Sequence, residues 1–170
     1  SGHAAAAGNV LIYDGTGRHP APLAAELAKN SGARVSFVSI DPVLSEELTY
    51  AERLSWKKRF LQLGLEHVSE TRLLSVTKEG NQLKATLLNE ISREKTSIVV
   101  DQVVVEQGTV PINEIFDELR DEAANKGVTN LDAMVTLRPQ PRLQEKGFEL
   151  HRIGDAVSSR NIHAAMLDAV

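Results

Sequence analysis

The feature that most constrains the fold is a pattern of strand, glycine turn, helix and strand within the first 40 residues. A short apolar run at 10–13 ends at Asp14, as is typical of a buried parallel strand. Helix formers follow over 22–29, and a polar turn then leads to a second β-rich run at 34–40. Together these segments predict a βαβ unit of the kind found in nucleotide-binding α/β folds.

The next 65 or so residues extend this pattern and then change it. A helix is predicted over 49–62 and a short strand over 65–68. Between 71 and 105 short apolar segments alternate with polar residues around a Glu-Gly-Asn turn, which indicates an antiparallel three-stranded meander. A buried type of strand follows at 102–106. We therefore predict an α/β fold, with a Rossmann-like, mainly parallel sheet, flanking helices and an antiparallel β-meander insertion.

The remaining segment is predicted with fewer regular elements. A helix is expected over 112–125, and a polar, proline-containing loop with at most a short helix over 126–146. A last strand is predicted at 148–153 and a last helix at 161–170. Ser158 and Ser159 are the candidate caps of this helix.

Charge and composition exclude several classes of function. The formal net charge is −4, which argues against a sequence-independent nucleic-acid surface. No run approaches the roughly 18 apolar residues of a membrane helix. The chain has no cysteine, so it can supply neither a thiolate nucleophile nor ligands for an iron–sulfur cluster. We expect a cytoplasmic protein without a nucleic-acid or membrane partner.

No catalytic or metal-binding constellation is apparent. The five histidines lack the i,i+3 or i,i+4 spacing of a helical metal site, and no carboxylate cluster completes one. The serines lack the context of a nucleophile elbow. We therefore predict no catalytic residue and no metal ligand.

The glycine turn after the first strand is the candidate nucleotide site. Gly15 can form the tight turn and Gly17 can let backbone approach a pyrophosphate, with Arg18 beside them. The spacing is G-x-G-x-x-P, however, and Pro20 offers no N–H. The carboxylate of Asp14 would cost roughly 3 kcal/mol at about 5 Å from a phosphate. A working phosphate site and a purely structural turn both remain open, and the second is favoured.

Two later motifs follow predicted strands. One places Gly108 and Pro111 after three consecutive valines. The other is the phrase Ile153-Gly154-Asp155, followed by a helix with small residues. Each can be a simple strand-to-loop turn, and the functional alternative makes Gly108, Gly154 and Asp155 candidate cofactor-binding residues.

The order of these motifs resembles the pyridine-nucleotide domain and closing segment of flavoprotein reductases with two dinucleotide folds. Within that superfamily the chain is most similar to the C-terminal part of the trimethylamine dehydrogenase and 2,4-dienoyl-CoA reductase group of NADH:flavin oxidoreductases. The phrases at 10–14, 103–109 and 152–165 carry the resemblance. It implies that Asp155 contacts a flavin ribitol, and that Gly15 and Gly17 face NAD(P)H or nothing.

The resemblance also implies a division of the chain. We expect a cloning remnant or linker at 1–8, an NAD(P)-type nucleotide-fold domain at 9–111 and a helix and loop at 112–146. The closing strand and helix of an incomplete FAD-type domain would occupy 147–170. Members of the group carry an N-terminal FMN-binding barrel and a 4Fe-4S cluster, neither of which this sequence contains.

These points lead to one functional expectation and one alternative. The chain would be a nucleotide-fold fragment of a multidomain flavin and iron–sulfur oxidoreductase acting on N-methylated amines or enoyl-type substrates. We call the full-length protein of which this chain would be a fragment the parent. FMN and 4Fe-4S, with FAD, ADP or NAD(P) as further candidates, would belong to the parent. The fragment itself would hold no cofactor and would not catalyse the reaction. Its partners would be the remaining domains of the parent and an adenine nucleotide. The alternative is a stand-alone adenine-nucleotide-binding sensor or scaffold, favoured if the native gene begins near Asn9.

Overall fold

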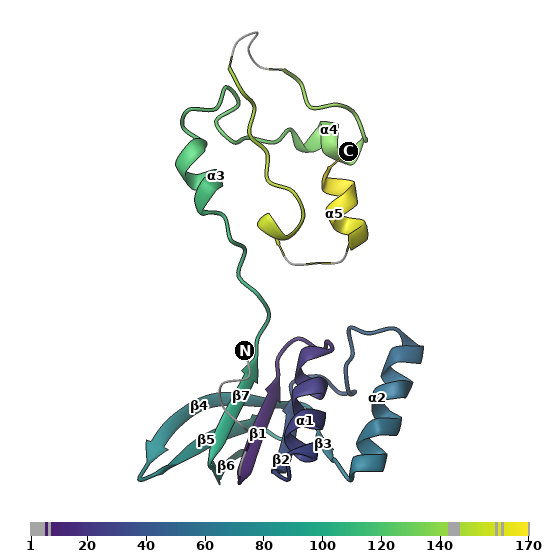
Figure 1. Ribbon diagram of the computed structural model, residues 1–170, viewed down its shortest axis with the longest axis vertical. Helices are drawn as coiled ribbons and strands as arrows, with labels where there is room; N and C mark the ends of the chain where they lie inside the picture. The colour runs from purple at the N-terminus through teal and green to yellow at the C-terminus, as the bar shows by residue number, and fades with distance from the viewer. Residues whose placement is uncertain (1–5, 7, 143–146, 159, 161, 170) are drawn as a thin grey trace. The chain divides into compact units, whose positions relative to one another are not determined.

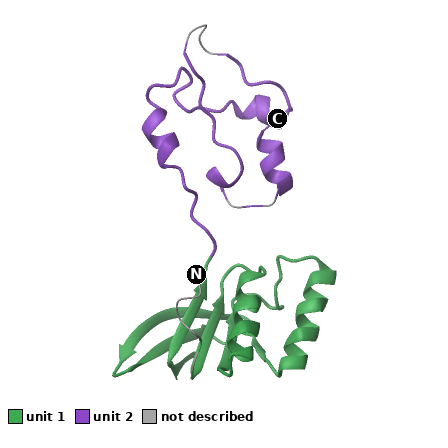
Figure 2. Ribbon diagram, viewed as in Figure 1, with its two compact units in different colours: residues 1–107 green, residues 108–170 purple. Residues whose placement is uncertain are grey.

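The computed structural model describes residues 6, 8–142, 147–158, 160 and 162–169. The chain divides into two compact units, residues 1–107 (unit 1) and residues 108–170 (unit 2) (Figure 2). The expected linker at 1–8 lies largely outside the described residues, as do Ser159 and the first residue of the expected last helix.

Unit 1 contains a four-stranded, fully parallel sheet, as predicted. The strand order is β3-β2-β1-β7 (Figure 1). Val10 pairs with Val35 on one side and Gln102 on the other, so β1 is a central strand with buried residues throughout its apolar run. The strands are β1 (Asn9–Asp14), β2 (Arg34–Ser39), β3 (His67–Val68) and β7 (Gln102–Glu106).

Two helices cover one face of this sheet. Helix α1 (Pro20–Asn30) buries small side chains against the sheet, and its two leucines are exposed. Helix α2 (Tyr50–Leu63) begins with a capping box between Thr49 and Glu52, and Gly64 ends it in the left-handed conformation. The apolar core on this side includes Val10, Ile12, Ala21, Ala25, Ala28, Phe37, Trp56 and Phe60.

A separate antiparallel sheet covers the other face, and this confirms the predicted meander. Its strands are β4 (Thr71–Glu79), β5 (Gln82–Asn89) and β6 (Lys95–Val100), in that order. The two sheets share a second apolar core. The parallel sheet contributes Leu11, Tyr13 and Val38, and the antiparallel sheet contributes Ala85, Leu87 and Val100. The central strand β1 is therefore buried from both sides, which explains its continuous apolar run.

Unit 2 departs from the sequence-based expectation in two places. The helix expected over 112–125 is only α3 (Glu114–Leu119), and the segment 148–153 forms no strand within the described residues. A strand needs a neighbour for its backbone bonds, and here the side chain of Asn125 bonds both the N–H and the carbonyl of Leu150 instead. The other elements are α4 (Leu131–Val135), the 3₁₀ turn η1 (Gly154–Ala156) and α5 (Ile162–Asp168).

Among the described residues, no helix has the length and apolar character needed to cross a bilayer.

Candidate functional site

In the candidate nucleotide turn, the side chain of Asp14 bonds the backbone N–H groups that a phosphate would need. Asp14 ends β1 and is fully buried. Its Oδ1 accepts hydrogen bonds from the backbone N–H of Gly17 at 2.8 Å and of Thr16 at 3.2 Å. In a phosphate-binding turn such N–H groups face the anion. Here Asp14 already occupies them, so the turn presents no free N–H cradle at these two positions.

Both glycines of the turn are required by close packing. The N–H of Gly15 donates to the carbonyl of Glu106 at 2.8 Å, and a Cβ on Gly15 would lie 2.9 Å from that oxygen. Gly17 has φ +65°, and a Cβ there would lie 2.7 Å from Oδ2 of Asp41. These contacts explain the glycines without a ligand.

Carboxylates surround the turn. The loop after β2 closes over it, because the N–H of Glu47 donates to the carbonyl of Gly17 at 3.1 Å. Burial raises the pKa of Asp14, and the negative charges of Glu106 and Asp41 raise it further. Burial also raises the pKa of Asp41. A pyrophosphate at this turn would lie among three acidic side chains, Asp14, Asp41 and Glu106, and any of them in the charged form would repel it.

The neighbouring basic residues do not reverse this charge. His19 accepts a hydrogen bond from Nε1 of Trp56 at its Nδ1 (3.0 Å), while its Nε2 lies 3.4 Å from Oε1 of Glu52. Arg18 makes no ion pair with the residues that the structure describes. Helix α1 begins at Pro20, which has no N–H to offer. NAD(P) therefore does not fit the residues of this turn.

Ser39 and His67 form a pair that the sequence did not predict. Oγ of buried Ser39 lies 2.7 Å from Nε2 of His67 and also donates to the carbonyl of Asp41 at 3.0 Å. A hydroxyl has one proton, so Nε2 of His67 is the donor in the other bond. Burial lowers the pKa of His67, which keeps this imidazole neutral. The pair links β2 to β3, and the hydroxyl proton of Ser39 is directed to the carbonyl of Asp41 and not to His67.

In unit 2 the Gly154–Asp155 motif forms a tight turn beside α5. Gly154 has φ +58°, and a Cβ there would lie 3.0 Å from Cβ of Ala165. Its N–H donates to Oδ2 of Asp168 at 3.0 Å, and the same oxygen is ion-paired with Arg160. Arg160 lies in the phrase at 152–165 that carries the resemblance, whereas Asp168 had no signal in the sequence that distinguished it from a surface charge.

The carboxylate of Asp155 points elsewhere. Asp155 is exposed and makes no hydrogen bond or ion pair within the described part of the chain. With Thr109, Val110, Ile112 and Ala156 it lines a cleft of about 280 Å³. Gly108, with φ +86°, immediately precedes this cleft. The structure thus brings Asp155 near the segment that follows Gly108, whereas Gly15, Gly17 and Arg18 belong to unit 1.

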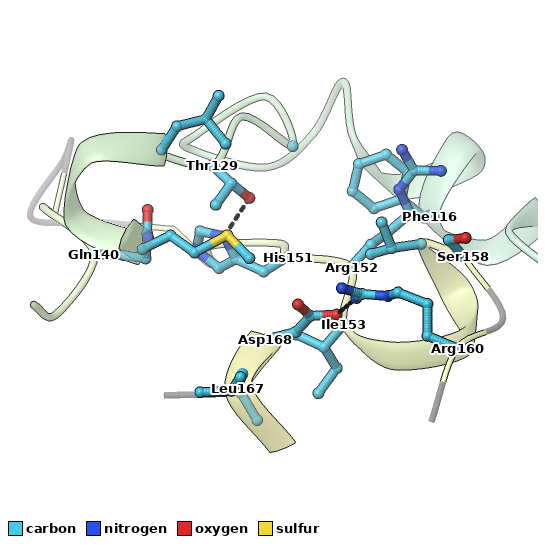
Figure 3. A pocket seen from close by; sticks show the side chains of 15 residues that line it. Phe116, Thr129, Gln140, His151, Arg152, Ile153, Ser158, Arg160, Leu167 and Asp168 are labelled. Atoms are coloured by element: carbon cyan, nitrogen blue, oxygen red, sulfur yellow. Dashed lines mark hydrogen bonds and ion pairs between the residues drawn. The ribbon is translucent and has the colours of Figure 1, made fainter. Parts of the chain in front are cut away.

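A larger cavity of about 660 Å³ lies among α3, α4 and α5 (Figure 3). The guanidinium of Arg152 stacks over the ring of Phe116 at 4.5 Å, and Nδ1 of His151 lies 3.3 Å from Oγ1 of Thr129. Much of the remaining lining is apolar, from Leu131, Met134, Ile153, Val157 and Leu167. Within the described residues, no group of histidines and carboxylates is arranged to hold a metal ion.

Comparisons with known proteins locate the chain within larger enzymes. No family model matches it. It is 36% identical over 166 residues to a multifunctional alkene reductase/demethylase of Caballeronia cordobensis, covering 95% of this chain and 25% of that protein. It is 38% identical over 175 residues to a probable N-methylproline demethylase of Rhizobium meliloti (strain 1021), covering 100% of this chain and 25% of that protein.

The fold is found in solved structures as well. A 6-hydroxypseudooxynicotine amine oxidase from Pseudomonas geniculata N1 superposes with a TM-score of 0.70 at 18% identity, over 95% of this chain and 21% of that chain. The chain spans about a quarter of the length of the curated relatives that it matches. These findings agree with the resemblance in the sequence: the chain belongs to the trimethylamine dehydrogenase and 2,4-dienoyl-CoA reductase group, as a C-terminal nucleotide-fold fragment of a larger flavoprotein.

Proposed function

We propose that the chain is the nucleotide-fold region of a flavin and iron–sulfur oxidoreductase that removes methyl groups from N-methylated amines. The observation that carries this proposal is the match of nearly the whole chain to a probable N-methylproline demethylase and to an alkene reductase/demethylase. The flavin, with FMN and 4Fe-4S as the expected groups, would lie in the part of the parent outside this chain. Reduction of an enoyl-type substrate is the second candidate, because one of the two relatives is named an alkene reductase as well as a demethylase.

Within the parent, we assign the two units different duties. Unit 1 has the architecture of an NAD(P)-type domain but a turn filled by Asp14, so its role is structural. Unit 2 would close an FAD-type fold, with the unpaired carboxylate of Asp155 facing the ribitol or ribose of a flavin or adenine nucleotide. The exposed apolar side chains of unit 2 support this assignment, because they need further polypeptide to cover them.

The full-length parent provides the test of the proposed reaction. We expect the purified parent to contain flavin and to release formaldehyde from N-methylproline or another N-methylated amine in the presence of an electron acceptor. Oxidation of an N-methyl group gives an iminium that water hydrolyses to formaldehyde and the demethylated amine. A parent that contains flavin but reduces only enoyl substrates would favour the second candidate, and a parent without flavin would reject both.

Nucleotide binding by the 170-residue chain tests the assignment of unit 1. We expect NADH and NADPH to bind with a Kd above about 10 μM, equivalent to less than roughly 7 kcal/mol, because Asp14 and Pro20 oppose pyrophosphate docking. Isothermal titration calorimetry gives the constant. The double substitution Asp14→Gly with Pro20→Gly should increase the affinity.

The control for this experiment is Asp101→Asn. Asp101 is an exposed carboxylate that bonds the N–H of Asn9, at the opposite end of β1 from the turn, so its substitution should leave nucleotide affinity unchanged. Binding of either nucleotide by the unaltered chain below about 10 μM would contradict a structural turn. It would favour the stand-alone nucleotide sensor instead.

A further inference from the structure

Unit 1 leaves an apolar surface uncovered where α1 lies next to the edge strand β7. This α1–β7 surface consists of Leu23, Ala24 and Leu27 of α1 with Val104 of β7. Val104 pairs in register with Ile12, whose side chain lies in the helix-side core, so Val104 also faces the helical side of the sheet. Leu27 is 60% exposed, Leu23 45% and Val104 40%.

The topology explains why this surface is bare. Parallel strands are normally covered by helices on a face that no other sheet covers. Figure 1 shows α2 on the side of α1 that is away from β7. Among the described residues of unit 1, no third helix follows to cover β7. The place of a neighbouring helix beside α1 is therefore unfilled.

The side chains of α1 agree with a helix that has neighbours on two sides. Its sheet-facing side is made of small residues, Ala21, Ala25 and Ala28, which bring it close to the sheet. Leu23 and Leu27 are one helical turn apart, outside the buried row of small residues, and they form a ridge against which a second helix can pack. Exposed leucines at this spacing are favourable only when other apolar atoms cover them.

We propose that the α1–β7 surface docks an amphipathic helix from the part of the parent polypeptide outside this chain. The inference rests on the proposed function, in which the chain is part of a larger flavoprotein. The relatives have about three quarters of their length outside the matched segment, so ample polypeptide exists to supply such a helix. A stable dimer of this chain would need about 800 Å² from each partner, and the α1–β7 surface has three large apolar side chains to offer, Leu23, Leu27 and Val104. A segment tethered in the same polypeptide needs less area because its effective concentration is high.

Thiol labelling tests this docking directly, because the chain has no cysteine of its own. Leu27→Cys is introduced into the 170-residue chain and into the full-length parent, and the rate of labelling is followed by mass spectrometry of the peptide that contains it. The introduced thiol should react at least tenfold more slowly in the parent. Leu23→Cys provides a second variant if the first parent protein does not fold.

Leu61→Cys is the matched control. Leu61 is 82% exposed on α2, and its thiol should react at similar rates in both proteins. Equal rates at position 27 in chain and parent would overturn the proposal. The proposal would also be overturned if position 27 of the 170-residue chain were labelled more slowly as the protein concentration rises. A second copy of the chain would then cover the surface. A parent that protects position 27 but shows no amine oxidation would reject the proposed function and retain this surface.

Discussion

A chain of residues 1–107 is expected to fold alone, whereas a chain of residues 108–170 is expected to lack fixed tertiary structure. Unit 1 buries two apolar cores, one on each face of its parallel sheet. In unit 2, Ala123 and Ala133 are the buried apolar side chains among the described residues, while fifteen large apolar side chains are exposed. Two alanines cannot offset the conformational entropy of ordering some 60 residues, at about 1–2 kcal/mol for each backbone unit.

Circular dichroism and urea unfolding distinguish the two outcomes. The 1–107 chain should unfold cooperatively, with Trp56 fluorescence as the probe, and the 108–170 chain should show no near-ultraviolet signal and no unfolding transition. The 170-residue chain serves as the control and should unfold with the midpoint of the 1–107 chain. A cooperative transition in residues 108–170 alone would show that unit 2 has a sufficient core of its own.

The substitution Asp14→Asn should stabilise unit 1 by about 1–2 kcal/mol at pH 7, because it removes a charge whose burial raises the pKa of Asp14, and one pKa unit corresponds to about 1.4 kcal/mol. Asparagine retains the oxygen that accepts the N–H bonds of Thr16 and Gly17, and it removes the buried charge. Oδ2 of Asp14 has no partner among the described residues, so the loss of its charge forfeits no bond. Urea unfolding followed by Trp56 fluorescence gives the free energy of unfolding.

The pH dependence of this gain follows from the direction of the pKa shift. The pKa of Asp14 is raised in the folded state by burial, so the folded protein binds the proton more tightly than the unfolded chain. The contribution of Asp14 to the free energy of unfolding is fully present below the unfolded value of 3.8 and is lost as the pH rises through the folded value. The advantage of Asp14→Asn should therefore be largest at neutral pH and shrink toward pH 4.

Asp101→Asn is a control, because the pKa of Asp101 is shifted in the opposite direction to that of Asp14. The N–H of Asn9 and the side chain of Gln82 hold the pKa of Asp101 below its usual value. Its contribution to stability is present above pH 3.8 and is lost as the pH falls through the folded value. If Asp14→Asn instead destabilised the protein at neutral pH, the bonds from the N–H groups of Gly17 and Thr16 to the charged oxygen would outweigh the cost of burying the charge.

Sequence reasoning predicted unit 1 well because its signals are local. A buried parallel strand needs a continuous apolar run, and a meander needs alternation with glycine turns, so 10–13 and 71–105 could be assigned directly. Membership of the flavoprotein group also followed from local phrases. The capping of α2 by Thr49 and Glu52 is a similarly local pattern.

The errors arose where structure depends on distant partners. The segment 148–153 has a strand-like sequence, yet no strand lies beside it among the described residues, and Asn125 bonds its backbone instead. The sequence also marked Asp14 as an obstacle to phosphate. It could not show that the same carboxylate bonds the turn's own N–H groups, because that depends on the backbone path between Asp14 and Gly17.

The closure of the glycine turn has a consequence for how this protein can change over time. The obstacles to a phosphate come from separate stretches of sequence: Asp14 after β1, Pro20 at the start of α1, Asp41 in the loop after β2 and Glu106 at the end of β7. A mutation that alters one of them leaves the others in place. Recovery of a pyridine-nucleotide site would therefore need several coordinated substitutions, and the intermediates would lose bonds of the turn before they gained a ligand.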